Sequence, residues 1–236
     1  MSFKTATSRR IILPTNDLAF RKLFSDERHK DVLAGFIRDV FGLKVEPVDL
    51  QITDPYSIEM LPSTLFPLRG KKREELRQRL RDVTVLVNLA RHHRGDDDPN
   101  SGHGLSFGPV ITLEMQVQPQ RPYVARALNY ASGVFLKYSH DVAAARPVWS
   151  MNILAFRLFD DDMALHRYGL YDIDTLQPLE PDLMQIGFFE LPKIPDSPAL
   201  AAWRLFFLTG KVADDAPAYL KAAAGIINVK TSLGDR

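Results

Sequence analysis

Near the N-terminus, apolar residues recur every three or four positions, the spacing of helices that bury one face. The first such run, residues 18–24, follows a polar stretch at 15–17 whose side chains can accept hydrogen bonds from a first helical turn. The second run, residues 32–41, lies behind a similar start signal at 25–27 and is followed by Gly42, a common helix-ending residue. The pattern therefore predicts two amphipathic helices.

Apolar and polar residues then alternate in three segments, as they do in strands that bury one face. The segments are 48–53, 82–87 and 110–120, and the last of them is VITLEMQVQPQ. Its polar face carries Thr112, Glu114, Gln116 and Gln118. Its other face, which we expect to point into the core, carries Ile111, Leu113, Met115 and Val117. The segments 82–87 and 110–120 are consecutive, so we expect an antiparallel pair joined by a long polar loop at 91–109.

The rest of the chain continues the mixture of helices and strands. The run at 148–156 is apolar on both faces, which is typical of a strand buried on both sides of a sheet. The other elements that we predict are a helix at 123–138, strands at 166–173 and 183–191, a helix around 203–208 and a weaker helix at 216–225. These elements together predict a mixed α/β fold.

Length and composition fit an ordinary globular protein. The 236 residues are 45% hydrophobic and 25% charged, without an internal repeat, so we expect one domain over 1–195 and a short helical C-terminal extension over 196–236. Cysteine is absent, which excludes disulfides and thiol nucleophiles. The apolar run at 11–13 is too short for a signal peptide, and no run approaches the ~18 apolar residues of a membrane helix. We therefore expect a cytoplasmic protein with no membrane partner.

The net charge of +1 is uninformative, but basic residues are concentrated in one segment. Between 69 and 81 lie seven of them against two acidic residues: Arg69, Lys71, Lys72, Arg73, Arg77, Arg79 and Arg81. Such a cluster can neutralise the phosphates of a nucleic acid even when the whole chain is nearly neutral. The alternative is a charged face exposed to solvent, which is common for runs of this kind.

Glu114 and Asp82 offer oxygen ligands on neighbouring predicted strands. Hydrolysis of a phosphodiester requires stabilisation of developing charge and an activated water, and Mg²⁺ held by hard oxygen ligands supplies both. If both carboxylates point to one face, they could share one ion. The alternatives are a solvent-facing or salt-bridged Glu114 and a surface charge at a strand end for Asp82.

Several ordered segments together resemble one branch of the PD-(D/E)XK nuclease superfamily. They are PTNDLAFRKLF at 14–24, Asp82 before a hairpin, LEMQ at 113–116, the helix with Arg126 and Tyr130, SMNILAFRLF at 150–159 and FFELPK at 188–193. The branch is the PD-(D/E)XK nuclease family transposase group, also called the recombination-promoting nuclease family, and the resemblance covers roughly residues 12–210. It implies a restriction-endonuclease-like α-β-β-β-α-β core and a Mg²⁺-dependent DNA endonuclease, associated with mobile elements and DNA recombination.

The resemblance also implies roles for individual residues. Asp82 and Glu114 would hold Mg²⁺ (or Mn²⁺), with the backbone carbonyl of Met115 as a third ligand. Gln116 stands where much of the superfamily has lysine; its amide can orient a water but supplies no positive charge. Catalysis is thereby assigned to Asp82, Glu114 and Gln116.

Further residues are expected around this site. Arg126 and Tyr130, one turn apart on a helix, would face the site and contact phosphate, whereas the alternative is that they only pack on the helix surface. Asp17 is either an outer metal ligand or an acid favoured by the start of its helix. Lys71, Lys72, Arg73, Arg77 and Arg79 would bind nucleic acid.

Two features depart from the family pattern. The loop 91–109 widens the gap between Asp82 and Glu114, and its His92, His93, Asp96, Asp97, Asp98 and His103 match no ligand spacing. The segment after Leu208 is shorter than the helical region that related proteins typically carry. A second hypothesis therefore stays open: a catalytically inactive member that binds nucleic acid or a partner protein. The oligomeric state also stays open, with a homo-oligomer among the options.

Overall fold

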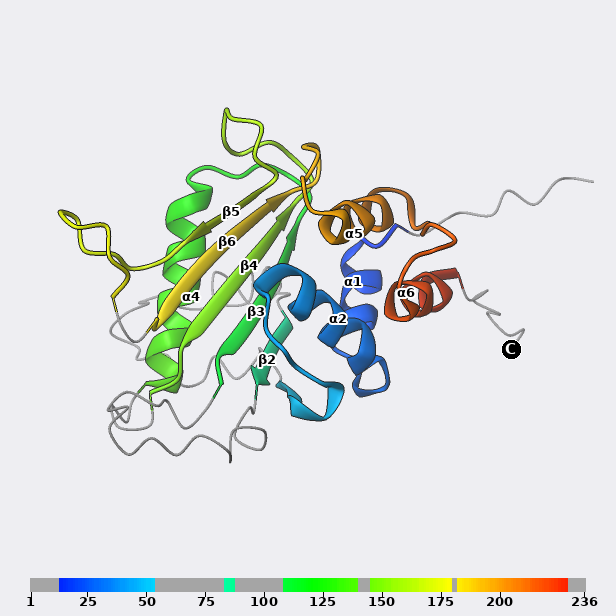
Figure 1. Ribbon diagram of the computed structural model, residues 1–236, viewed down its shortest axis with the longest axis horizontal. Helices are drawn as coiled ribbons and strands as arrows, with labels where there is room; N and C mark the ends of the chain where they lie inside the picture. The colour runs from blue at the N-terminus through cyan, green and yellow to red at the C-terminus, as the bar shows by residue number, and fades with distance from the viewer. Residues whose placement is uncertain (1–12, 54–82, 88–107, 140–144, 180–181, 229–236) are drawn as a thin grey trace, which may run out of the picture.

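The computed structural model describes residues 13–53, 83–87, 108–139, 145–179 and 182–228 of the chain. The described residues form a mixed α/β fold in which helices cover both faces of one sheet (Figure 1). Helix α4 (Tyr123–Tyr138) packs on one face, and helices α1 (Asp17–Phe24), α2 (Lys30–Phe41), α5 (Pro198–Thr209) and α6 (Ala218–Asn228) pack on the other. The mixed α/β class predicted from the sequence is confirmed.

Helix α1 begins at its predicted start signal and α2 ends at its predicted glycine, whereas the predicted start signal at 25–27 begins a 3₁₀ turn ahead of α2. The side chain of Asn16 accepts a hydrogen bond of 3.0 Å from the Leu18 N–H and caps α1. Helix α2 follows a short 3₁₀ turn, η1 (Glu27–His29), and ends at Gly42. Gly42 has φ of 73°, a left-handed conformation that glycine adopts without steric cost. Both predicted helices are therefore confirmed.

The sheet has six strands in the order β1-β2-β3-β4-β6-β5. Their bounds are β1 Leu50–Thr53, β2 Val83–Val87, β3 Val110–Gln116, β4 Val148–Leu154, β5 Leu165–Tyr168 and β6 Met184–Glu190. Strands β1, β2 and β3 pair antiparallel, β3, β4 and β6 pair parallel, and β5 pairs antiparallel with β6. The predicted antiparallel pairing of the second and third strands is confirmed.

Strand β4 is buried on both faces, as its sequence predicts. Met151 and Ile153 point into the core beneath α1, α2, α5 and α6, whereas Leu154 belongs to a second cluster beneath α4. This second cluster includes Tyr123 and Phe188. The sheet thus separates two apolar layers, and α4 lies between β3 and β4 in the chain.

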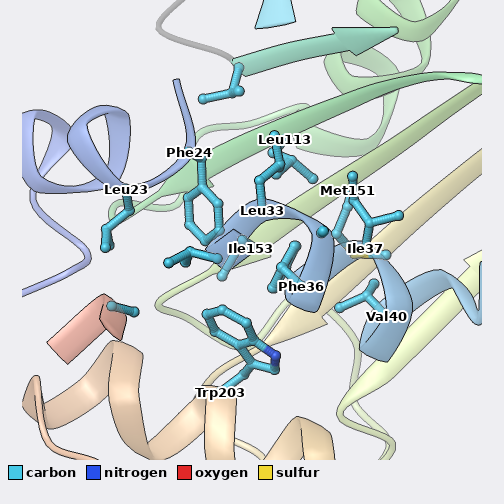
Figure 2. Close-up of a cluster of buried hydrophobic side chains, with 14 of the residues drawn as sticks. Leu23, Phe24, Leu33, Phe36, Ile37, Val40, Leu113, Met151, Ile153 and Trp203 are labelled. Carbon is cyan, nitrogen blue, oxygen red and sulfur yellow. The ribbon is translucent and has the colours of Figure 1, made fainter. Parts of the chain in front are cut away.

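The larger core contains residues of both the N-terminal and the C-terminal helices. The ring of Trp203 on α5 contacts that of Phe36 on α2 edge-on, with centroids 5.0 Å apart and planes at 87°. Figure 2 shows these rings with the aliphatic side chains that the sheet contributes: Leu113, Met151 and Ile153. The helices within 196–228 therefore pack in the same core as α1 and α2, and the two predicted C-terminal helices are confirmed.

The predicted strands differ from the observed ones mainly at their ends. Strand β3 ends at Gln116 rather than at 120, since Pro119 has no N–H to donate to a ladder; Val117 is consequently 48% exposed and not in the core. Strand β1 begins at Leu50 because residues 47–49 form a 3₁₀ turn, η2 (Pro47–Asp49). Strand β5 ends before Gly169, β4 ends at Leu154 and β6 ends at Glu190.

Among the described residues, no helix combines the length and the apolar character needed to cross a lipid bilayer.

Candidate functional site

Glu114 is buried near the carboxyl end of β3, on the face that α4 covers. Only 9% of the residue is exposed, and it is the register partner of Asn152 on β4. Removal from water disfavours the charged form, so burial raises the pKa of Glu114 to about 7, and the positive charge of Arg126 opposes this rise. The polar face of β3 is therefore covered rather than solvated, because Thr112 beside it is buried as well.

Arg126, in the first turns of α4, is the cation that faces Glu114. Its Nη2 lies 3.4 Å from Oε1 of Glu114 and donates a hydrogen bond of 2.9 Å to Oε1 of Gln116. Its Nη1 donates a hydrogen bond to Oε1 of Gln120. Oxygens from three side chains around the end of β3 thus surround one guanidinium group.

Two aromatic rings of α4 complete this arrangement. The Cζ atom of Arg126 lies 4.7 Å from the centroid of the Tyr123 ring and 5.9 Å from that of Tyr130. A guanidinium at these distances is attracted by the negative face of the ring. The predicted grouping of Arg126 and Tyr130 with Glu114 and Gln116 is therefore present in the structure.

The amide of Gln116 is bonded at both ends. Its Oε1 accepts from Arg126, and its Nε2 donates a hydrogen bond of 2.9 Å to the carbonyl of Gln118. These two bonds fix the amide with its oxygen toward the cation. Glu114 and Gln116, two residues apart on one strand, thus present oxygens to the same positive charge.

The backbone at the end of β3 adds one more oxygen. The carbonyl of Gln116 accepts a hydrogen bond of 3.0 Å from Ala155 N–H, so it points toward β4. Successive carbonyls along a strand point to opposite neighbours, and the carbonyl of Met115 therefore points toward the β2 side. On that side, Val83 pairs with Leu113.

Several predicted site residues lie outside the described part of the chain. They are Asp82, Lys71, Lys72, Arg73, Arg77 and Arg79, and the loop histidines and aspartates at 92–103 lie outside it too. Asp82 directly precedes Val83 in the sequence. Asp17 is described: it begins α1, in the helix layer on the other face of the sheet from Glu114, and Asn16 beside it provides the helix cap.

Sequence reasoning missed the polar pair that joins α4 to the sheet. The hydroxyl of Tyr123 donates a hydrogen bond of 3.0 Å to Oδ1 of the fully buried Asn152, whose Nδ2 donates one of 3.0 Å to the carbonyl of Gly187. An asparagine in an otherwise apolar strand was the available signal, because buried amides require partners. This pair fixes α4, and hence Arg126, over β3.

A second polar cluster lies at the end of β6, in the FFELPK segment. The buried Lys193 Nζ donates hydrogen bonds of 2.6 Å to Oε2 of Glu190 and 3.1 Å to Oδ1 of Asp161. His166 Nε2 lies 2.9 Å from Asp161 Oδ2. Burial lowers the pKa of Lys193, but its bonds to Glu190 and Asp161 outweigh that effect and raise it. Glu190 Oε1 also accepts from the backbone N–H of Phe159, so the cluster anchors the loop after β4.

The donor set at Glu114 suits a hard cation. Its side-chain oxygens are carboxylate and amide, the ligand types of Mg²⁺, and they already bind a positive group. Within the described ranges, no group of three or more histidine, cysteine, aspartate or glutamate residues could hold a metal ion. Of the acids predicted to hold the metal directly, Asp82 and Glu114, only Glu114 lies among the described residues.

Comparison of the chain with models of protein families, with curated proteins and with solved structures gives no match.

Proposed function

We propose that this protein is a Mg²⁺-dependent DNA endonuclease of the recombination-promoting, transposase-like type. The observation that carries the proposal is Glu114, a buried carboxylate held against a cation at the end of a central strand. A buried carboxylate is usually paired with a cation or bound to a metal. Carboxylates with perturbed pKa values are concentrated at functional sites.

The strand register supports the assignment of Asp82 as the second acid. Val83 pairs with Leu113 in the antiparallel pair of β2 and β3. In the sequence, Asp82 directly precedes Val83 and Glu114 directly follows Leu113. In the proposed site Asp82, Glu114 and the carbonyl of Met115 hold the ion.

The order of elements also supports the proposal. Helices α1 and α2, the strands β1, β2 and β3, helix α4 and strand β4 follow one another as an α-β-β-β-α-β core requires. The parallel pairing of β3 with β4 places the crossover helix α4 over the end of β3. We therefore propose that these elements form a restriction-endonuclease-like core.

Each residue then has a defined task. A bound Mg²⁺, or Mn²⁺ in its place, would supply positive charge and lower the pKa of a water. Gln116 would orient a water through its amide, and Arg126 would bind a phosphate oxygen next to Tyr130. The basic residues of segment 69–81 hold the DNA backbone by charge. A homo-oligomeric state is a secondary part of the proposal, whereas Asp17, which begins α1 in the opposite helix layer, is left out of the proposed site.

Plasmid nicking tests this function. The wild-type protein with Mg²⁺ or Mn²⁺ should convert supercoiled DNA into the open-circular form, and Glu114→Gln and Asp82→Asn should each abolish the conversion. Asp215→Asn, which neutralises an exposed acid on the loop before α6, is the matched control and should nick at the wild-type rate. Equal nicking by wild type and Glu114→Gln overturns the proposal.

The contact between Glu114 and Arg126 favours a second candidate, an inactive member that binds nucleic acid or a partner protein. A carboxylate committed to a guanidinium is not available to an ion. This candidate predicts no cleavage with any divalent metal, together with DNA binding that weakens with salt and is unchanged in Asp82→Ala.

A further inference from the structure

We infer that Arg126 competes with the metal: its guanidinium and a divalent ion both bind the Glu114 carboxylate, so metal loading displaces Arg126 from Glu114. The inference rests on the proposed function and adds a means of regulating its site. The contact between Glu114 and Arg126 then does not prevent metal binding, because the ion replaces the guanidinium at Glu114.

The first step is the shared position. Nη2 of Arg126 lies 3.4 Å from Oε1 of Glu114 and 2.9 Å from Oε1 of Gln116. In the proposed site a divalent ion binds the same Glu114 carboxylate that Nη2 contacts, at Mg–O distances of about 2.1 Å. The repulsion between a divalent ion and the guanidinium disfavours binding of both, and it is strong where water is excluded.

The second step is that the hydrogen bonding of the Arg126 guanidinium is incomplete. Both terminal nitrogens have oxygen partners, yet Nε is buried and has no hydrogen-bond partner among the described residues. A buried donor without a partner costs free energy that is recovered when the group returns to water. The side chain therefore contacts the Glu114 carboxylate and is held weakly enough to be displaced by an ion.

The third step is where Arg126 goes. It belongs to the first turns of α4, next to the exposed residues Arg121, Pro122 and Val124 at the surface end of the helix. Once displaced from Glu114, the guanidinium can reach solvent and bind a phosphate group through two parallel hydrogen bonds. Metal binding would thus create the phosphate-binding group, which makes DNA engagement depend on a loaded site.

Calorimetric titration with Mn²⁺, in the absence of DNA, tests this inference directly. The proteins are the full-length wild type, Arg126→Gln, and the control Arg121→Gln, which removes a nearby exposed charge without touching Glu114. The titration is run at about pH 8.5, because metal binding requires an ionised carboxylate and a high pH favours that form. We expect Arg126→Gln to bind Mn²⁺ at least about 10-fold more tightly than wild type, and Arg121→Gln to match wild type.

Further proteins separate the possible failures. Arg126→Lys keeps the charge but lacks the planar, spaced donors of the guanidinium, so its affinity for Mn²⁺ should fall between those of wild type and Arg126→Gln; it also serves if Arg126→Gln does not fold. Equal or weaker Mn²⁺ binding by Arg126→Gln or Arg126→Lys, with loss of binding in Glu114→Gln, overturns the competition and leaves the proposed function standing. Absence of binding in every protein overturns the proposed metal-dependent function and this inference with it.

Discussion

The carboxylate of Glu114 faces the guanidinium of Arg126 across 3.4 Å, and both side chains are mostly buried between α4 and the sheet. The two residues are twelve positions apart and come from a strand and the helix that follows it. The charge of Arg126 offsets only part of the cost of burying Glu114, because burial still raises the pKa of this carboxyl to about 7. Proton and guanidinium therefore compete for this carboxylate, and in the proposed function a metal ion would compete with both.

The first prediction concerns pH and stability. The folded protein keeps the proton of Glu114 up to about pH 7, whereas the unfolded chain releases it near 4.5, so this stabilisation is complete below 4.5 and is lost as pH rises through 7. Residue 114 does not titrate in Glu114→Gln. The difference in free energy of unfolding, variant minus wild type, should therefore increase by up to about 3 kcal/mol from about pH 5 to about pH 8. Urea unfolding at both pH values measures the gain.

Asp215→Asn serves as the control for that experiment, since an exposed acid should change stability little at either pH. A difference between Glu114→Gln and wild type that is the same at both pH values would contradict the raised pKa of Glu114.

The second prediction concerns the hydrogen bond that holds α4 on the sheet. Tyr123→Phe leaves the buried Oδ1 of Asn152 without its donor and should lower the free energy of unfolding by about 1–3 kcal/mol. Because α4 carries Arg126, the affinity of Tyr123→Phe for Mn²⁺ should differ from that of wild type. Tyr171→Phe removes a hydroxyl from an exposed ring and is expected to stay within about 0.5 kcal/mol of wild type. Similar losses in both variants would refute the role of Asn152.

The third prediction concerns the ion pair at the end of β6. Lys193→Met leaves Glu190 buried without its ammonium partner and should destabilise the fold by about 3 kcal/mol in thermal or urea unfolding. The double variant Glu190→Gln with Lys193→Met removes the unpaired charge and should recover part of that loss. Lys211→Met, at an exposed position, is the control; a cost for Lys193→Met no larger than for Lys211→Met would show that the pair contributes nothing.

The fourth prediction compares two helical glycines. A Cβ on Gly35 would lie 2.4 Å from Cδ2 of Tyr219, whose ring is stacked on Trp203 and hydrogen-bonded to Asp39, so Gly35→Ala should cost about 1–3 kcal/mol. A Cβ on Gly225 meets nothing within 4 Å, so Gly225→Ala should stabilise α6 by roughly 0.5–1 kcal/mol. Urea midpoints that shift in the same direction for both variants would contradict this account of the α2–α6 contact.

Local patterns predicted the elements well because they depend on neighbours in the chain. The apolar spacing in residues 32–41 and the glycine after it are sufficient for α2 and its end, and the helix predicted at 123–138 has the observed bounds of α4. Strand ends were less predictable, since the end of β3 depends on where its neighbours stop pairing and on Pro119. The predicted site was recovered in part: Glu114, Gln116, Arg126 and Tyr130 come together, whereas Asp17 begins a helix in the opposite layer.

The sequence alone determined that Glu114 and Gln116 share one face of a strand, because side chains alternate along any pleated backbone. Only the tertiary structure decided that this face is buried, because burial requires a second layer, here α4, whose position depends on the parallel pairing of β3 with β4. The same packing placed Arg126 on Glu114. Periodicity shows which way a side chain points, and only packing of distant segments determines which group it meets and how strongly water is excluded there.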